Sequence, residues 1–528
     1  MRQCTLGVAL AILLAAPAAA QLPAIGAPRG VFRLELGAGF ANASEQYHDG
    51  SLEPWRAQFA SPGVGTAYYP ELASTQAQVA RLSGIGNYQL SIGQAAMTAQ
   101  ASTGTLTLGA TLGITPKLSL FGHVPFVRQA VSVDYRLDSL GANAGFNPAD
   151  PVFGTAAGAD SVTTFLLAYQ EALDTLGARI TAGYYDAVPA DLALAQATLA
   201  SGTAYLAGLD SLYLVAGAAT SYVPLAGSAA GLAMADSVAG TQGALTTLGI
   251  PAFTQPLPLP AAAITQPEYN TYLSSFAGPI AARPIDDVSS FLAGDAELGA
   301  AYTFIDRWNR EGAPGGLRLV GTALLRLPTG SQPFPNDFVS LPTGGGQTDI
   351  QASVVADVGG ARFGGRFSAT YNDQLSYTSD RRVTLPSQPI PWQNRLATVT
   401  TDPGNELLLS AMPYWQIAPG LAIVGVVRFW SRGEDAVEYA SGAALVAGVS
   451  ASELAQGTQR SATTLGGGLS YAPTPRCRGT APCTPPLGLD AFWLYEAVVA
   501  ASGGVVPKAG TVRMGIRWPL RLWGGTGD

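Results

Sequence analysis

The C-terminal segment of the chain alternates between apolar and polar side chains. One face carries Val512, Met514, Ile516, Trp518, Leu520 and Leu522, and the other carries Arg513, Gly515, Arg517, Pro519 and Arg521. A period of two residues is the period of a β-strand. Three arginines on one face indicate a watery interior or a network of ion pairs. The pattern predicts a strand of a membrane-spanning barrel, with a half-exposed strand of a soluble sandwich as the alternative.

Composition favours the barrel. Charged residues make up only 12% of the chain, and the mean hydropathy is positive. A soluble protein with so few charges would struggle to cover its surface with polar groups. The best apolar run after the N-terminus lies between Asp210 and Asp236, and Pro224 and several glycines interrupt it. Without spanning helices, a closed barrel is the other backbone solution for a bilayer.

The alternation recurs along the chain and predicts an all-β fold, a transmembrane antiparallel up-and-down barrel of about twelve strands. Fourteen strands are the alternative. The expected strands lie near 30–42, 95–113, 117–135, 289–305, 316–330, 346–358, 361–377, 404–416, 419–437, 460–473, 488–502 and 508–523. Short and long connections alternate, as short periplasmic turns and long outer loops do in bacterial barrels. An even strand number then places both termini in the periplasm.

The chain divides into four parts. Arg2, an apolar run and Ala18–Ala20 predict a secretory signal peptide over 1–20, so the mature chain should start at Gln21. Barrel strands with a long first outer loop follow over 21–135. A helical, extracellular insertion is expected over 136–288, and the remaining strands over 289–528. Residues 21–29 are too few for an N-terminal plug domain.

Helical spacing marks the insertion. Val162, Phe165, Leu166, Tyr169, Leu173 and Leu176 follow a helical period, as do Tyr269, Tyr272, Leu273, Phe276 and Ile280 after Pro267. Leu192, Ala195 and Leu199 predict a third helix, and 229–247 a fourth. Two interpretations stay open: a self-packed cap, or a lid that captures apolar ligands at the barrel mouth.

No catalytic or cofactor motif is present, so the chain is expected to be no enzyme and to need no cofactor or metal. His123 should face the lumen, where a structural role is the ordinary one. The net charge of −8 argues against nucleic-acid binding. Cys477 and Cys483 are predicted to form a small disulfide loop, since an exported chain meets an oxidising compartment.

Inward-facing charges are the candidate site. The predicted lumen-facing residues are Arg33, Glu35, Asp295, Glu297, Arg318, Arg326, Asp349, Arg362, Arg366, Arg428, Arg513, Arg517 and Arg521. Charged side chains inside a membrane protein must be paired with an opposite charge or hydrated. The set therefore predicts a salt-bridge network that stiffens the wall, a polar constriction that filters solutes, or both.

Three motifs carry a family resemblance: Gly294–Tyr302, Leu325–Gly330 and Gly346–Asp349, and Leu118–Phe126 also fits the family. They resemble the phenol meta-pathway degradation family of outer-membrane transporters, which is similar in role to fatty-acid and aromatic-hydrocarbon importers. The resemblance covers roughly 110–135 and 289–377, with looser similarity onward. The resemblance implies an outer-membrane channel of a Gram-negative-type bacterium for small molecules, hydrophobic or aromatic ones among them. The expected partners are outer-membrane lipid, the barrel-assembly machinery and the solute, with a monomer favoured. The alternative is a non-transporting surface barrel that anchors a helical cap for adhesion or assembly.

Overall fold

The computed structural model describes residues 25–523, apart from 215–220, 252, 308–315, 340, 361, 385–389, 391, 393, 419 and 473–487. The predicted signal peptide over 1–20 lies outside the described residues. So do Cys477 and Cys483, and their disulfide therefore stays a prediction.

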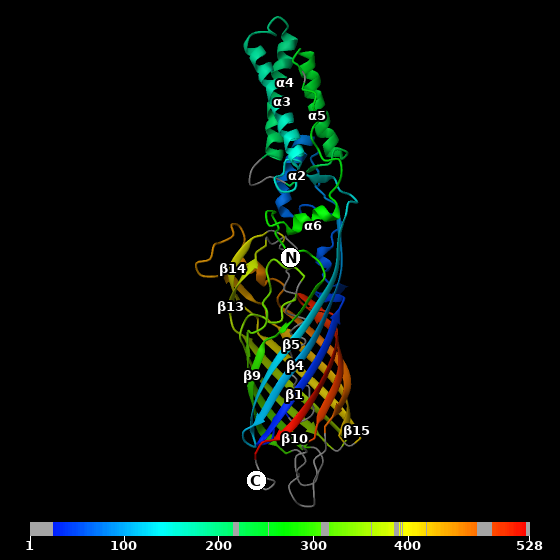
Figure 1. The fold of residues 1–528 in the computed structure, drawn as a ribbon, viewed down its shortest axis with the longest axis vertical. Helices are drawn as coiled ribbons and strands as arrows, with labels where there is room; N and C mark the ends of the chain where they lie inside the picture. The colour runs from blue at the N-terminus through cyan, green and yellow to red at the C-terminus, as the bar shows by residue number, and fades with distance from the viewer. Residues whose placement is uncertain are drawn as a thin grey trace, which may run out of the picture.

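Twelve long strands form a closed barrel (Figure 1). They are β1 (Val31–Ala43), β4 (Gln94–Gly113), β5 (Leu118–Asp138), β9 (Ala296–Asp306), β10 (Gly316–Leu327), β11 (Asp349–Gly359), β12 (Phe363–Gln374), β15 (Glu406–Ala418), β16 (Leu421–Arg432), β18 (Arg460–Tyr471), β19 (Asp490–Ser502) and β21 (Gly510–Arg521). Each pairs antiparallel with the strand before and after it, and β1 pairs with β21 to close the ring. The predicted twelve-stranded up-and-down barrel is confirmed.

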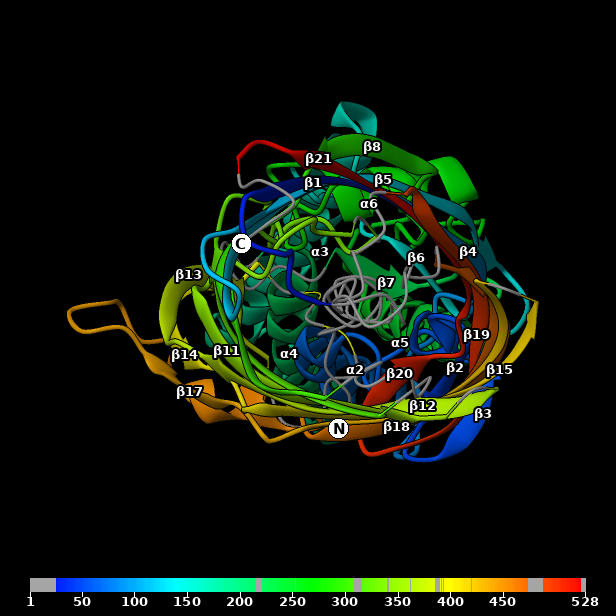
Figure 2. The ribbon, with the colours of Figure 1, turned by 90° about the horizontal axis from the view of Figure 1, so that it is seen from below.

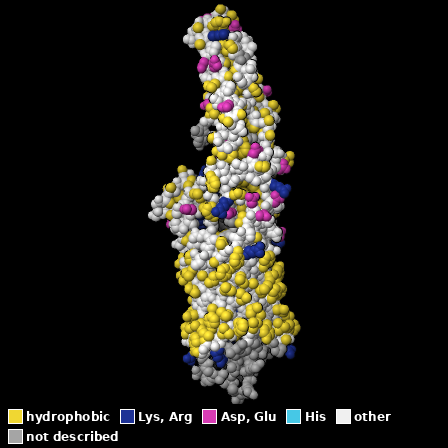
Figure 3. All heavy atoms as spheres, in the orientation of Figure 1, with side chains coloured by type: hydrophobic (Ala, Val, Ile, Leu, Met, Phe, Trp, Pro, Cys, Tyr) yellow, Lys and Arg dark blue, Asp and Glu magenta, His cyan; other side chains and the backbone are white. Residues whose placement is uncertain are grey.

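The outer face of the barrel is apolar. Most of the outward positions of β1 and β21 carry exposed large apolar side chains, for example Leu34, Leu36, Ile516 and Trp518, and Figure 3 shows hydrophobic side chains concentrated around the barrel wall. Exposed aromatic residues gather at both ends of this surface: Phe304, Phe363, Trp415, Tyr471, Trp493 and Trp518 near the short turns, and Phe40, Phe291, Tyr371 and Phe429 near the long loops. An apolar band flanked by aromatic girdles is typical of a barrel that spans a bilayer.

The two ends of the barrel differ in the length of their connections. β4 and β5 are joined over 114–117, β11 and β12 over 360–362, and β15 and β16 over 419–420. The start of β1 and the end of β21 lie at this same end, since Val31 pairs with Arg521. Loops 44–93, 139–287 and 375–405 emerge at the opposite end. This is the alternation that the sequence predicts, with the insertion on the long-loop side.

One predicted strand is wrong in detail. The segment expected as one strand over 289–305 is interrupted at Gly294–Asp295, giving β8 (Val288–Ala293) and β9, both paired with β5. Pro125 of β5 has no N–H to donate at the break, and Gly294 N donates to its carbonyl at 2.8 Å. On the other side, β10 ends at Leu327 before Pro328, so among the described residues β8 pairs only with β5.

Two of the resemblance motifs, and the residue before the third, meet at this interruption. Asp295 accepts hydrogen bonds from the backbone N–H groups of Gly330, at 2.8 Å, and Gly345, at 3.2 Å. The Thr329 hydroxyl donates to Gly294 O and accepts from Ala296 N, both at 2.9 Å. The loop 328–348 thus replaces a strand beside β8 and completes the wall through side chains.

The long loops carry the remaining elements. They are β2 (Glu45–His48), β3 (Ser51–Pro54), η1 (Ala57–Phe59), η2 (Pro70–Leu72), α2 (Ala73–Ser83), β6 (Ala144–Phe146), α3 (Ala156–Thr181), α4 (Pro189–Tyr213), β7 (Tyr222–Pro224), α5 (Ala229–Thr247), α6 (Gln266–Ser274), β13 (Tyr377–Arg382), β14 (Leu396–Asp402), β17 (Ala436–Tyr439), η4 (Ala451–Ala455) and β20 (Val505–Pro507). The four helices predicted in the insertion are present, but α6 ends at Ser274, so the predicted helix positions Phe276 and Ile280 lie outside it. Helix α2 lies in the first loop and was not predicted.

Local signals explain where these helices begin. The Thr155 side chain accepts from Gly158 N before α3, and Ser228 does the same for Gly231 N before α5. Thr265 and Glu268 form a capping box at the start of α6. Such caps satisfy N–H groups that have no partner within the helix.

Helices α3, α4 and α5 form a stalk that points away from the barrel along its long axis (Figure 1). Helix α3 has 26 residues, which corresponds to about 39 Å. Helix α4 is long and apolar enough to cross a membrane by length and composition, with a third of that window buried. Its position in the stalk, packed against α2, α3 and α5, gives it the role of a packing helix instead.

Candidate functional site

A row of charged and polar side chains follows the inner wall of the barrel. From strand to strand it runs through Arg517, Glu35, His123, Glu297, Arg326, Asp349, Asn372, Glu406, Arg432 and Arg460, and we call it the lumenal girdle. Its members are in register except at β12, where Gln374 stands opposite Asp349 and Asn372 lies two positions before Gln374 on the same face. Successive members lie on neighbouring strands, except that β4 contributes Gly109 between Glu35 and His123. The alternation of the strands puts these residues on the face opposite the lipid-facing side chains.

Arg326, near the middle of the girdle, forms ion pairs with both of its neighbours. Its Nη2 lies 3.0 Å from Glu297 Oε1, and its Nη1 lies 2.8 Å from Asp349 Oδ2. Its side chain is about nine-tenths buried, as are those of both carboxylate partners. A buried cation between two carboxylates satisfies all three charges, and removing it would leave two uncompensated charges.

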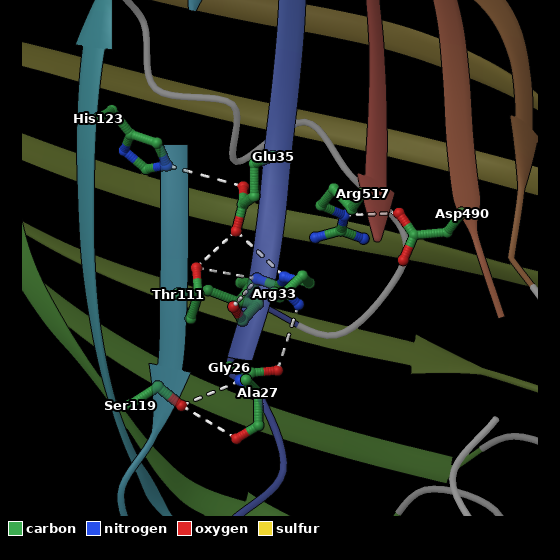
Figure 4. A network of polar contacts seen from close by, with 10 residues as sticks. Gly26, Ala27, Arg33, Glu35, Thr111, Ser119, His123, Asp490 and Arg517 are labelled. Carbon is green, nitrogen blue, oxygen red and sulfur yellow. Dashed lines mark hydrogen bonds and ion pairs between the residues drawn. The ribbon is translucent and has the colours of Figure 1, made fainter. Parts of the chain in front are cut away.

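The start of β1 forms a second polar network (Figure 4). Arg33 Nε lies 3.0 Å from Glu35 Oε1, and the Thr111 hydroxyl also donates to Glu35. His123 lies between Glu35 and Glu297, at 3.7 and 3.8 Å. The histidine can reach across β4 because Gly109 has no side chain: a Cβ there would lie 2.3 Å from His123 Cδ2.

The N-terminal segment before β1 lies against the same wall. Arg33 Nη2 donates to Ile25 O at 2.9 Å, and Ala27 exchanges two hydrogen bonds with the Ser119 hydroxyl (Figure 4). These few residues line the wall of the lumen at the short-turn end.

Further ion pairs connect strands elsewhere around the barrel. Arg366 Nε lies 2.6 Å from Asp357 Oδ1, and Arg517 Nε lies 2.6 Å from Asp490 Oδ1. Arg428 of β16 reaches Glu496 of β19 at 3.1 Å. The ion pairs join the same, neighbouring or next-but-one strands, so they follow the wall and do not bridge the lumen.

The predicted lumen-facing residues fall into three groups. Arg33, Glu35, Glu297, Arg326, Asp349, Arg366, Arg428 and Arg517 are buried or nearly so on the inner face, with Arg513 half-buried there. Asp295 braces the interruption between β8 and β9, and Arg318 pairs with half-exposed Asp306.

Arg362 and Arg521 do not fit the prediction, because both are exposed at the short-turn end. Arg362 precedes the first residue of β12, and Arg521 is the last residue of β21. Side chains where a strand leaves the membrane can turn to water, and alternation alone does not mark that point.

Several members of the girdle were not among the predicted site residues. Asn372 contacts the carboxylates of Asp349 and Glu406, and Arg460 begins β18 next to Arg432. Asn372 could have been predicted as lumen-facing, because it is a polar residue on the polar face of an alternating strand. Arg460 was harder to predict, because it is the first residue of its strand, where the alternation begins.

Above the lumen, the long loops share one hydrophobic core, which we call the outer core. Its aromatic centre consists of Phe59, Tyr68, Tyr69, Tyr135, Tyr269, Tyr272, Phe338 and Trp392. These residues come from four different outer connections and the extended end of β5. Seen along the barrel axis, α2, α4, α5 and β7 lie within the ring of strands (Figure 2). The outer core therefore covers the long-loop mouth.

Trp392 is the centre of the outer core and is fully buried. Phe338 and Phe59 pack edge-on against its ring, with centroids at 5.2 and 5.6 Å. Tyrosine hydroxyls form a chain beside it, from Tyr68 to Tyr135 at 3.0 Å and from Tyr135 to Tyr269 at 3.0 Å. The chain ends at Tyr69, 2.6 Å from Tyr269. Burial raises the pKa of Tyr69 and of Tyr269 well above the usual value, so both stay neutral.

Arg382 at the end of β13 ties three outer segments together. It donates to Trp392 O at 2.7 Å, to Ile280 O at 2.7 Å and to the Asn336 amide oxygen at 2.8 Å, and it lies over the Phe338 ring. The side chain is buried, and its partners are neutral oxygens. This residue fixes the loops over the mouth.

Among the described residues, no group of three or more His, Cys, Asp or Glu side chains could hold a metal ion. Most charges of the girdle are already paired, and the outer core offers apolar and aromatic surface. Such an arrangement can guide or exclude a solute according to its polarity.

A closed barrel with an apolar, aromatic-flanked outer face and a charged inner face defines the class of transmembrane β-barrels. Neither a family model nor a curated protein matches the chain, and membership of the phenol meta-pathway family stays a prediction. Among solved structures, the COG4313 outer membrane channel from Pseudomonas putida F1 aligns with a TM-score of 0.40 and 9% identity, over 94% of this chain and 97% of that one.

Two other solved structures are similar at lower scores. The Ralstonia pickettii toluene transporter TbuX aligns with a TM-score of 0.27 and 9% identity, over 94% of this chain and 90% of that one. The translocator domain of the autotransporter NalP from Neisseria meningitidis aligns with a TM-score of 0.27 and 7% identity, over 93% and 89%. At these scores the likeness carries no conclusion about function.

Proposed function

We propose that the protein is an outer-membrane transport protein that admits small apolar molecules, aromatic ones among them, and excludes hydrophilic solutes. The observation that carries the proposal is the outer core, which covers the mouth of a charged lumen with buried aromatic side chains. The signal peptide expected over 1–20 supports export to that membrane.

The outer core separates this barrel from an open porin. A hydrophilic solute must move through continuous water, and here Trp392, Phe59 and Phe338 occupy the entrance with no exposed ring face. An apolar solute that displaces one of these rings replaces one apolar contact with another. A sugar would have to give up its hydrogen bonds to water, so the free-energy barrier to its entry is higher. Twelve strands also give a narrower lumen than the sixteen or more of a porin.

Uptake by intact cells tests this proposal. A Gram-negative host that lacks its own hydrocarbon channel would express the protein, and the initial uptake rates of labelled toluene and labelled arabinose would be measured. The expected result is faster toluene uptake and unchanged arabinose uptake, relative to cells that express a lumen-filled eight-stranded barrel. Faster arabinose uptake without an effect on toluene would contradict the proposal.

The stalk favours a second candidate function, in which the barrel anchors a surface module for adhesion or assembly. Helices α3, α4 and α5 extend well beyond the aromatic centre of the outer core, farther than a lid requires (Figure 1). Cells that express the protein with and without residues 156–247 would be compared for surface binding and toluene uptake. Lost binding with unchanged uptake supports an adhesive stalk; unchanged binding removes this candidate.

A further inference from the structure

Four buried oxygen atoms without a partner gather at the long-loop end of the lumenal girdle. They are Asp349 Oδ1, Asn372 Oδ1, Gln374 Oε1 and Glu406 Oε1, and none of them has a hydrogen-bond partner in the part of the chain that the structure describes. All four residues are at most 7% exposed. A buried polar atom without a partner costs free energy, so four of them on one patch need an explanation.

The strand register brings these residues together. Gln374 of β12 stands directly opposite Asp349 of β11, and Asn372 stands directly opposite Glu406 of β15. Opposite residues have Cβ atoms about 5 Å apart. Gln374 and Asn372 are two positions apart on one strand, so both side chains lie on the same face. The four positions thus place two carboxylates and two amides on one patch of the inner wall, with Asn372 between the two carboxylates.

Water satisfies this set poorly. All four atoms are acceptors, and one water molecule donates only two hydrogen bonds. The neighbouring arginines do not reach these four atoms. Arg326 binds Glu297 and the other oxygen of Asp349, Oδ2, and Arg432 donates to Asp435 at 2.7 Å. The Nε atoms of Arg432 and Arg460 are buried without a partner, so neither donates to Glu406 Oε1. A cation surrounded by oxygens would serve all four acceptors at once and offset the repulsion between the two carboxylates.

The Asn372 contacts fit the same explanation. Its amide nitrogen lies 3.4 Å from Asp349 Oδ2 and 3.4 Å from Glu406 Oε2, long for hydrogen bonds. Such long contacts hold the amide nitrogen only weakly, and the amide oxygen, Oδ1, keeps no partner in the described part of the chain.

We propose that Asp349, Asn372, Gln374 and Glu406 form a Ca²⁺ site in the upper lumen. Oxygen ligands of this kind suit Ca²⁺, whereas Mg²⁺ keeps several waters that this buried patch has little room for. Two carboxylates and nearby Arg432 and Arg460 make the site a weak one, with a Kd on the order of 10⁻⁴–10⁻³ M, as in other extracellular Ca²⁺ sites. The ion would join β11, β12 and β15 below the outer core.

Calorimetric titration of the purified, chelator-washed protein with CaCl₂ tests the site. One Ca²⁺ per chain is expected, with binding at least about tenfold weaker in Glu406→Gln, which loses one charged ligand. Asn372→Asp should bind more tightly, because it adds a third carboxylate. Asp402→Asn is the matched control, since it removes an exposed carboxylate close to Glu406 in sequence and should leave binding unchanged.

A second measurement needs no variant, so it tests the site even if Glu406→Gln fails to fold. The wild-type thermal midpoint would be recorded with CaCl₂, MgCl₂ or NaCl against choline chloride at equal ionic strength. An upward shift with Ca²⁺ alone supports the site. The proposal is overturned by no Ca²⁺ binding, by equal binding in the wild type and Glu406→Gln, or by a shift that Mg²⁺ or Na⁺ produces without Ca²⁺.

Discussion

At the scale of single residues, charge pairing follows the barrel wall because glycines in intervening strands make room for it. Gly109 lets His123 approach Glu35, and Gly466 of β18 lies between Arg428 and Glu496, where a Cβ would be 2.9 Å from Glu496 Cγ. Long side chains can therefore lie flat over a neighbouring strand. The ion pairs of the girdle join neighbouring strands, as the predicted stiffening of the wall requires, and they leave the axis of the lumen free of the pairs described.

Arg326 is the residue whose loss should destabilise the wall most. Arg326→Met leaves Glu297 and Asp349 buried without their cation, and a loss of about 3–5 kcal/mol in the free energy of unfolding is expected. Reversible urea unfolding in lipid vesicles would measure it. Arg318→Met is the control: its partner Asp306 is half-exposed, so the expected change is about 0–1 kcal/mol. Equal losses in the two variants would refute the girdle's role.

At the scale of elements, the outer loops act as one unit because they share one core. Trp392 touches rings from the first outer loop, β5 and the loop 328–348. The insertion is part of this unit through Tyr269 and Tyr272 of α6. Deleting 145–285 would therefore expose the outer core as well as remove the stalk, which sequence alone did not indicate.

Trp392→Ala should loosen the mouth without disrupting the barrel. Removing a fully buried tryptophan costs about 3–5 kcal/mol of local packing, so loop opening becomes more frequent. Single-channel recordings should show higher conductance and more gating events than the wild type. Trp415→Ala removes an exposed, lipid-facing ring at the other end of the barrel and should leave conductance unchanged. A wild-type conductance in Trp392→Ala would argue against closure by the outer core.

The tyrosines of the outer core predict a dependence on pH. Burial raises the pKa values of Tyr69, Tyr222 and Tyr269 above the ordinary value of 10, and burial raises that of Tyr205 in the stalk to about 12. The unfolded loops lose these protons first, so the stabilisation is complete below pH 10 and is lost as the pH rises through the folded-state values. Near-ultraviolet circular dichroism should collapse above pH 10 while the β-signal persists. Tyrosine ionisation near pH 10 with tertiary signals intact would contradict this.

At the scale of the whole molecule, the barrel was predictable and its mouth was not. The alternation of apolar and polar residues predicted the two faces of β10 and β21 directly, because apolar side chains face the lipid and polar side chains face the lumen. The interruption between β8 and β9 left that alternation intact on both sides, so only Pro125 and Pro328 signalled it. Phe59, Phe338 and Trp392 come from separate loops without any period, and only the closed ring of strands brings them together.

The most direct test of the central claim is a permeability ratio. Asymmetric vesicles with a lipopolysaccharide outer leaflet would contain the purified protein, and influx of naphthalene and of arabinose would be measured against protein-free vesicles. The outer core predicts that the protein accelerates naphthalene influx and leaves arabinose influx near background, and that Trp392→Ala raises arabinose influx. Rapid arabinose influx through the wild type, with no effect on naphthalene, would contradict the account.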